Sequence, residues 1–269
     1  TDRDALYAAT RELFTEHLQT PLKFVTKLPV DLRQVLDDHY RPALHDAVRR
    51  AYLVGMVDDD AFETDPDETA ADADTPDAAA DAARKKSAET DYDSLVVFAL
   101  DLHTREHDLA PRRTDLANLT RSLNRAFHGH PVTVLFRYTA AGDHFISLAA
   151  CERTAYQQQW RDGEKPGKVS LLRDIRLHTP HAGHLRILTD LQLPRTGKKA
   201  VTTFSGLYAH WQQVLDTDVL NKQFYRELSN WYFWALAHVD WPADVEKDPA
   251  TRKATSVIRM LTRLLFCWF

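Results

Sequence analysis

The sequence predicts an α+β fold with N-terminal helices, a central mixed sheet with packed helices, and a C-terminal helical region. Three observations predict it. Apolar residues recur at helical spacing near the N-terminus, β-rich apolar runs bounded by turn residues occupy the middle, and helical spacing then returns. We therefore divide the chain into an N-terminal helical arm (1–56), an acidic linker or loop (57–91), a central α/β domain (92–199) and a C-terminal helical region (200–269).

The N-terminal arm is expected to contain two helical stretches. Residues 2–19 place Leu6 and Leu13 on one face, and residues 30–56 form a second stretch that Pro42 kinks or divides. The first residues are charged and lack the basic-then-apolar plan of a secretory signal. No apolar run approaches the ~20 residues that cross a membrane, so we expect a cytoplasmic protein.

The acidic segment separates the arm from the central domain. Between Asp58 and Asp81 there are eleven Asp or Glu and no Lys or Arg, and few residues that a core can bury. We expect a mobile linker with helical character near 78–86. The net charge of −5 hides this asymmetry, because the rest of the chain has 34 basic and 28 acidic residues. A mildly basic body permits nucleic-acid binding, and the acidic run is either a solvated segment or a mimic of nucleic acid.

The central domain reads as strand, helix, strand, strand. Residues 94–102 form the clearest strand, and residues 114–128 form an amphipathic helix with Thr114 as its N-cap. Residues 132–138 and 144–150 then form two strands joined by a turn.

Further along the chain, residues 168–177 add a strand, and Thr179 followed by Pro180 begins a helix. The C-terminal region predicts helices over 218–239 and 250–269. The first of these is dense in tryptophan and tyrosine. Because its aromatics follow helical spacing, we expect them to pack between helices rather than to stack on bases.

Common catalytic motifs are missing. The chain has no glycine-rich nucleotide loop, zinc-protease helix or esterase serine motif, which disfavours those chemistries within these residues. His178, His181 and His184 are close in sequence, but no carboxylate or thiolate lies at a supporting spacing, so no metal site is predicted. Cys151 and Cys267 both lie in apolar contexts and are expected to be buried, reduced thiols.

A metal-dependent nuclease is the one enzyme class that the central sheet suggests. Such enzymes hold Mg²⁺ with an Asp and a Glu on adjacent strands, followed by a Lys. Asp101 ends the first strand and Glu152 follows the third, but Arg153 and Thr154 come next and the Lys is missing. The two carboxylates are thus weak candidates, for an active or a degenerate nuclease.

Basic residues occur in two places where they can contact phosphates. Arg121 and Arg125 are spaced to share a helix face, and further basic residues flank that helix or follow residue 194. The alternative is a solvated face with local ion pairs. The candidate DNA-binding residues are Arg112, Arg113, Arg121, Arg125, Arg137, Lys198 and Lys199.

Several segments together resemble one family. They are FYRELSNWYFWALAHVDWP (224–242), SVIRMLTRLLFCWF (256–269), RTDLANLTRSLNRAFHGHPVTVLFRY (113–138), VSLLRDI (169–175) and PHAGHLRIL (180–188). They are similar to the region ahead of the methylase domain in type IIG-like restriction–modification proteins, the adenine-specific DNA methyltransferases. The resemblance covers roughly residues 92–269 and is weaker before them.

The resemblance implies a parent protein that methylates adenine N6 in DNA with S-adenosylmethionine, in defence against phage and other foreign DNA. The family's Asn-Pro-Pro-Tyr motif and glycine-rich methyl-donor motif are not in this chain. No catalytic or cofactor residue is therefore carried over, and the methylase domain is expected beyond Phe269.

This chain is then expected to be a non-catalytic accessory or DNA-recognition region that binds no cofactor of its own. Its partners would be double-stranded DNA and the methylase domain of the same chain, without a membrane. The alternatives are a nuclease domain that needs Mg²⁺ and a scaffold that docks the methylase.

Overall fold

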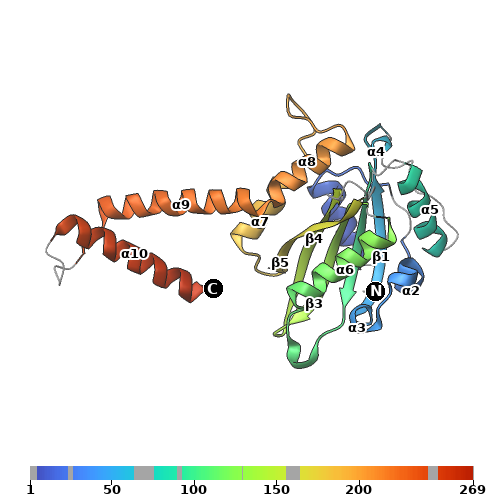
Figure 1. The fold of residues 1–269 in the computed structure, drawn as a ribbon, viewed down its shortest axis with the longest axis horizontal. Helices are drawn as coiled ribbons and strands as arrows, with labels where there is room; N and C mark the ends of the chain where they lie inside the picture. The colour runs from blue at the N-terminus through green and yellow to red at the C-terminus, as the bar shows by residue number, and fades with distance from the viewer. Residues whose placement is uncertain are drawn as a thin grey trace. The chain divides into compact units, whose positions relative to one another are not determined.

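The computed structural model describes residues 5–23, 27–63, 76–89, 93–128, 130–155, 164–241 and 248–268. The chain divides into two compact units, Thr1–Leu215 and Asp216–Phe269 (Figure 1). The expected α+β class is confirmed, because helices and a mixed sheet share the first unit.

One sheet organises the first unit. Its five strands lie in chain order, with β2 and β3 parallel and every other neighbouring pair antiparallel. A parallel pair needs a crossover connection, and helix α6 (Arg113–Ala126) supplies it between β2 and β3. The strands are β1 (Val48–Val57), β2 (Leu95–Leu102), β3 (Val132–Ala140), β4 (Asp143–Ala155) and β5 (Glu164–Arg176).

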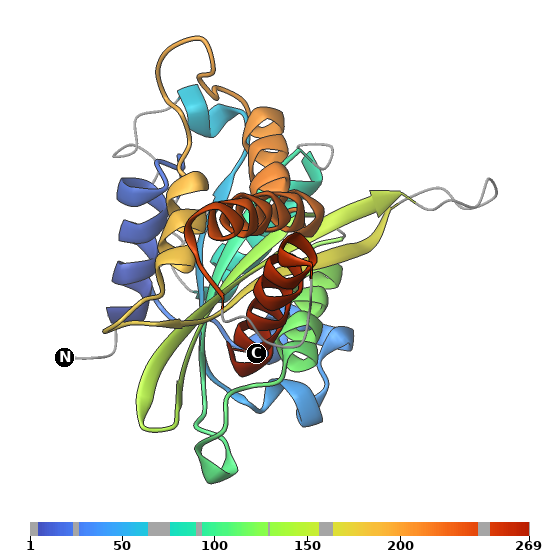
Figure 2. The ribbon, with the colours of Figure 1, turned by 90° about the vertical axis from the view of Figure 1, so that its left-hand side faces the viewer.

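Helices cover both faces of this sheet. On one face α2, α5 and α6 pack against Phe98 and Val134, and on the other α1, α7 and α8 pack against Val97 and Leu135 (Figures 1 and 2). Strand β2 is therefore buried along its whole length, which explains its unbroken apolar run. The bounds are α1 (Ala5–Glu12), a π-helical turn (Leu13–His17), α2 (Leu32–Leu36), α3 (Pro42–His45), α4 (Asp60–Glu63), α5 (Pro76–Glu89), α7 (Ala182–Asp190) and α8 (Phe204–Leu215).

The N-terminal arm contains a strand that the sequence reading missed. Only short helical pieces form between residues 32 and 45, and the stretch read as helix then becomes β1. Its second half is buried on both faces, and a short apolar run that is fully buried lacks the periodicity that separates strand from helix. The stretch 1–56 is therefore part of the sheet unit rather than a separate helical arm.

The outer edge of β1 is partly covered by the preceding chain. Lys23 and Met56 exchange backbone hydrogen bonds of 2.9 and 3.0 Å, and the N–H of Val30 donates to the carbonyl of Ala51 at 2.9 Å. Gly55 permits this approach, because a Cβ there would lie 2.6 Å from the carbonyl oxygen of Lys23.

The acidic segment is only partly described. Residues 64–75 and 90–92 lie outside the described residues. The helical character expected near 78–86 is confirmed by α5, but this helix is not part of a linker. Ala79, Ala80 and Ala83 are buried against the α2–α6 layer.

The two expected N-caps are each wrong by two residues. Helix α6 begins at Arg113 with Arg112 as its N-cap, so Thr114 lies inside the first turn. Helix α7 begins after His181, whose Nδ1 accepts the N–H of Gly183 at 3.1 Å, so Thr179 is not its cap. In both cases the tertiary path of the loop overrides the local capping preference.

The second unit consists of α9 (Thr217–His238) and α10 (Pro249–Trp268), close to the predicted helices. Ala235 and Val257 are buried, but five aromatic side chains are exposed, against our expectation of packing between helices. No helix in the described part of the chain is long and apolar enough to span a membrane. The exposed aromatics are Phe224, Tyr225, Trp231, Phe233 and Trp234.

Candidate nucleic-acid interface

Four of the predicted DNA-binding residues lie on α6, and we call them the α6 stripe: Arg112, Arg113, Arg121 and Arg125. Three of them are exposed and Arg121 is half-buried. The only hydrogen bond from these side chains to the described residues runs from Nη1 of Arg121 to Asn118 at 3.3 Å. Within the described ranges none of the four guanidinium groups pairs with a carboxylate.

The single acidic residue of α6 does not neutralise the stripe. Asp115 is paired with Arg105, at 3.5 Å between a carboxylate oxygen and Nη1. Its charge is therefore balanced by an arginine outside the helix. The stripe keeps its own positive charge.

The start of α6 concentrates donors for an anion. Arg112 and Arg113 lie at the N-cap and first position, where the helix dipole already presents positive partial charge. Each exposed cation there costs about 0.3–1 kcal/mol in an isolated helix at low salt. A phosphate at this point would be favoured both by these guanidinium groups and by the free N–H groups of the first turn.

The arginines of the stripe are spread along the length of α6. Arg113 and Arg125 are twelve residues apart, or about 18 Å along a helix that rises 1.5 Å per residue. One strand of duplex DNA carries a phosphate for about every 3.4 Å of its axis. Twelve residues also turn the helix by about 120°, so Arg113 and Arg125 point in different directions, and only Arg121 and Arg125, four residues apart, can contact neighbouring phosphates on one side of the helix.

Arg137 lies elsewhere, in a cluster that we call the clamp: Arg49, Asp101 and Arg137. Nε and Nη2 of Arg137 each donate to the Asp101 carboxylate at 3.1 Å, and Nε of Arg49 donates at 2.9 Å. Nη2 of Arg49 also binds this carboxylate. Strand pairing sets Asp101 level with Arg137, on the face of the sheet away from α6.

The clamp keeps a buried carboxylate charged. Asp101 is only 2% exposed, and burial alone would raise its pKa. Hydrogen bonds and charges from Arg137 and Arg49 outweigh the burial and lower the pKa below its usual range. The carboxylate is therefore ionised at neutral pH, and two guanidinium groups occupy its oxygens.

This geometry separates the two nuclease candidates. Asp101 is level with Arg137 and, across β3, with Ile146, whereas Glu152 lies six residues further along β4. Six residues of strand correspond to about 20 Å, too far for one shared metal ion. Among the described residues no group of three or more His, Cys, Asp or Glu could hold a metal.

The remaining predicted residues lie in a third place. Lys198 and Lys199 are exposed after a turn at Gly197, in the connection between α7 and α8. These helices cover the sheet face opposite α6. The seven predicted residues are therefore divided among the α6 stripe, the clamp and this connection.

The rings of His181 and His184 stay together, 5.9 Å apart, whereas the ring neighbour of His178 is His144. The ring of His178 lies 6.3 Å from that of His144, while His181 caps α7 and burial lowers the pKa of His184. Burial raises the pKa of the Cys151 thiol to about 11, which fits an unreactive core thiol. Cys267 is exposed, so the expectation that both thiols are buried is wrong for it.

Arg49 of the clamp, and His103 and His144 nearby, are residues that the sequence did not single out. Arg49 lies in the stretch read as helix, so nothing local pointed to Asp101, which is 52 residues away in the chain. His144 and His103 had no motif to mark them. A pattern search for an arginine near a strand end would have found Arg49 only after β1 had been recognised.

Compared with known proteins, this chain matches no family model, no curated protein and no solved structure.

Proposed function

We propose that this chain is a non-catalytic, DNA-recognition region of an adenine-specific restriction–modification methyltransferase, and that it holds double-stranded DNA through the α6 stripe. The observation that carries the DNA contact is the set of four arginines on one helix without a carboxylate partner among the described residues. The assignment to this class of enzyme rests on the sequence resemblance.

In this function the chain positions the DNA duplex and does not itself catalyse a reaction. Phosphate contacts fix the register and orientation of a protein on a duplex but carry no direct sequence information. S-adenosylmethionine and the adenine-methylating residues would belong to the methylase domain of the same protein. The setting would be the cytoplasm, in defence against foreign DNA.

Two charge-matched double variants test the stripe. Arg121→Gln with Arg125→Gln removes two positive charges from α6, and Lys198→Gln with Lys199→Gln removes two from the connection after α7. We expect the first pair to lower the salt slope of duplex binding by about 1.8, because each lost phosphate contact contributes about 0.9. The lysine pair should leave the slope close to that of the unchanged protein, in titrations across a series of salt concentrations.

Two results contradict the proposal. One is the absence of any duplex affinity at low salt. The other is an equal loss in both double variants, since that would show a response to net charge rather than a specific surface.

A scaffold that docks the methylase is the second candidate, favoured by the exposed aromatics of α9. Exposed clusters of large apolar side chains commonly mark interaction sites. Replacing Phe233 and Trp234 by Ser should abolish co-elution with a separately produced methylase domain. If co-elution survives, α9 is not the docking surface.

The nuclease alternative receives no support from the geometry of Asp101 and Glu152. A nuclease would cut DNA in the presence of Mg²⁺, and the Asp101→Asn variant would lose this activity. We expect the unchanged protein not to cut DNA.

A further inference from the structure

The clamp opens into a hollow of about 590 Å³ at one end of the sheet. This is the end where the parallel strands β2 and β3 have their carboxyl ends, and where ligands of open α/β sheets commonly bind. Beside the clamp, the lining includes His103, His144 and His178.

The side chains around this hollow favour an anion. Its described lining contains two guanidinium groups and one carboxylate, together with three imidazoles. Arg49 is the accessible member of the clamp, with 49% of its side chain exposed, whereas Asp101 is buried beneath it. Asp101 therefore holds the guanidinium group of Arg49 at the wall of the hollow. The planar, forked arrangement of donors in a guanidinium group matches the oxygens of a phosphate.

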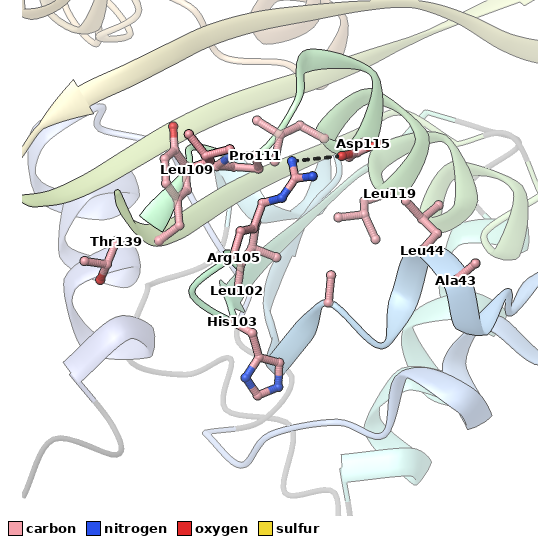
Figure 3. Close-up of a pocket in the computed structure, with 13 residues that line it drawn as sticks. Ala43, Leu44, Leu102, His103, Arg105, Leu109, Pro111, Asp115, Leu119 and Thr139 are labelled. Atoms are coloured by element: carbon pink, nitrogen blue, oxygen red, sulfur yellow. Dashed lines mark hydrogen bonds and ion pairs between the residues drawn. The ribbon is translucent and has the colours of Figure 1, made fainter. Parts of the chain in front are cut away.

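A second, smaller pocket, drawn in Figure 3, shares lining residues with the hollow. It has a volume of about 170 Å³ and is lined largely by apolar side chains of α3, α6 and the loop after β2, such as Leu44, Leu109 and Leu119. The Arg105–Asp115 ion pair lies among these side chains, as the dashed line shows. A dry apolar cavity of about 150 Å³ is known to accept one benzene ring, so this pocket has the volume for a single aromatic ring.

The two spaces meet because β2 is shorter than its neighbour. Strand β2 ends at Leu102, one residue past the last pair with β3 (Asp101 and Arg137), whereas β3 continues to Ala140. Leu102, His103, Tyr138 and Thr139 consequently line both the hollow and the pocket. A ligand lying across the end of β2 would reach an anion-binding wall on one side and an apolar slot on the other.

We infer that the hollow and the pocket form one bipartite site for a pyrimidine nucleoside monophosphate. The phosphate lies against Arg49 and the histidines, and the ring enters the apolar pocket. This goes beyond the proposed duplex contact, because the site is separate from the α6 stripe. A free nucleotide and the 5′-terminal nucleotide of a DNA strand share this chemistry.

Calorimetric titration with thymidine 5′-monophosphate, thymidine and inorganic phosphate tests the site. We expect saturable binding of the monophosphate and at least a tenfold weaker response to thymidine. Arg49→Gln should weaken monophosphate binding about tenfold or more, since a charge-assisted hydrogen bond contributes about 1.5–3 kcal/mol. Arg195→Gln is the matched control, because Arg195 lies over the ring of Phe62 and does not line the hollow.

A second variant tests the ring pocket without touching the clamp. Ala47 is exposed and lines the pocket, so Ala47→Leu narrows it with little risk to folding. This variant should weaken the binding of the monophosphate, while inorganic phosphate should bind with unchanged affinity. An equal effect on both ligands would contradict the placement of the ring.

Binding of short single-stranded DNA distinguishes a free nucleotide from the 5′-terminal nucleotide of a DNA strand. A strand with a 5′-phosphate that binds more tightly than the same strand with a 5′-hydroxyl, in an Arg49-dependent way, identifies a DNA end. Equal binding of the two strands, with Arg49-dependent binding of the free monophosphate, identifies a free nucleotide.

The inference is overturned if the monophosphate does not bind at millimolar concentration, or if Arg49→Gln binds it unchanged. These results are separable from the proposed function. The variant Arg121→Gln with Arg125→Gln should keep its monophosphate affinity, and duplexes without terminal phosphates report on the stripe alone.

Discussion

Two groups of arginines on this protein are built in opposite ways. The α6 stripe exposes most of its guanidinium groups on one helix, with no carboxylate paired to them in the described ranges, whereas the clamp holds two guanidinium groups on one buried carboxylate. Exposed charges are screened by salt and contribute little to folding. A buried charge that loses its partner destabilises the fold. We therefore expect the stripe to affect duplex binding with little effect on stability, and the buried carboxylate of the clamp to affect stability.

The largest effect is expected from Asp101→Asn. The variant keeps the shape of the side chain but leaves Arg137 and Arg49 without their shared anion, and it should lower the free energy of unfolding by about 2–4 kcal/mol. The lower half of this range allows for Arg49, which can turn toward water. Urea denaturation measures the loss.

Asp115→Asn is the control for this variant. Its pair with Arg105 is part-exposed and 3.5 Å long, so it should cost less than about 1 kcal/mol. Equal losses from the two variants would show that burial does not distinguish the clamp.

The stability that the clamp provides should depend on pH in the acid range. Arg137 and Arg49 lower the pKa of Asp101 in the folded state, while in the unfolded chain it returns to about 3.9. The contribution is therefore complete above this value and is lost as the pH falls through the lower, folded pKa. Thermal unfolding from pH 7 to pH 3 should show the gap between the unchanged protein and Asp101→Asn closing only below about pH 4. A gap that is the same at every pH would contradict this cause.

A smaller and opposite effect is expected at the start of α6. Arg112 is an N-cap without a side-chain hydrogen bond to the helix, and Arg112→Ser supplies the missing acceptor and removes an unfavourable charge. The variant should be more stable by about 1 kcal/mol and bind duplex DNA more weakly. If stability rises while DNA affinity is unchanged, Arg112 does not belong to the interface.

The smallest effect on stability is expected from Arg121→Gln with Arg125→Gln. Surface changes of this kind stay within about 0.5 kcal/mol. A thermal unfolding curve that matches the unchanged protein, combined with weaker DNA binding, would complete the contrast with the clamp. A large loss of stability would instead place these arginines in the fold.

The contrast also explains what the sequence predicted. The four arginines of the stripe lie within fourteen residues, and helical spacing alone places Arg121 and Arg125 together. The three residues of the clamp come from β1, β2 and β3, with Arg49 and Arg137 at 52 and 36 residues from Asp101. Only the strand register brings them together, so no local pattern reveals them.

The same difference between local and long-range patterns explains which elements of the fold were predicted. Strands β2 to β5 and helices α6, α7, α9 and α10 were predicted because turn residues separate them and their periodicity is clear. Strand β1 was missed because a short apolar run buried on both faces fits either a helix or a strand. That error also hid Arg49, since a residue assigned to the wrong element cannot be placed beside Asp101.

The covered edge of β1 has a consequence for the behaviour of the protein in concentrated solution. An apolar strand at the margin of a sheet is a template on which another chain can add, and this leads to fibres and aggregates. Lys23 and Val30 already bind the backbone of that margin near Met56 and Ala51, and Gly55 is the residue that lets the covering chain approach. This margin of the sheet is thus partly protected against intermolecular β-pairing, and a side chain at Gly55 would push the covering chain away from it, because its Cβ would lie 2.6 Å from the carbonyl oxygen of Lys23.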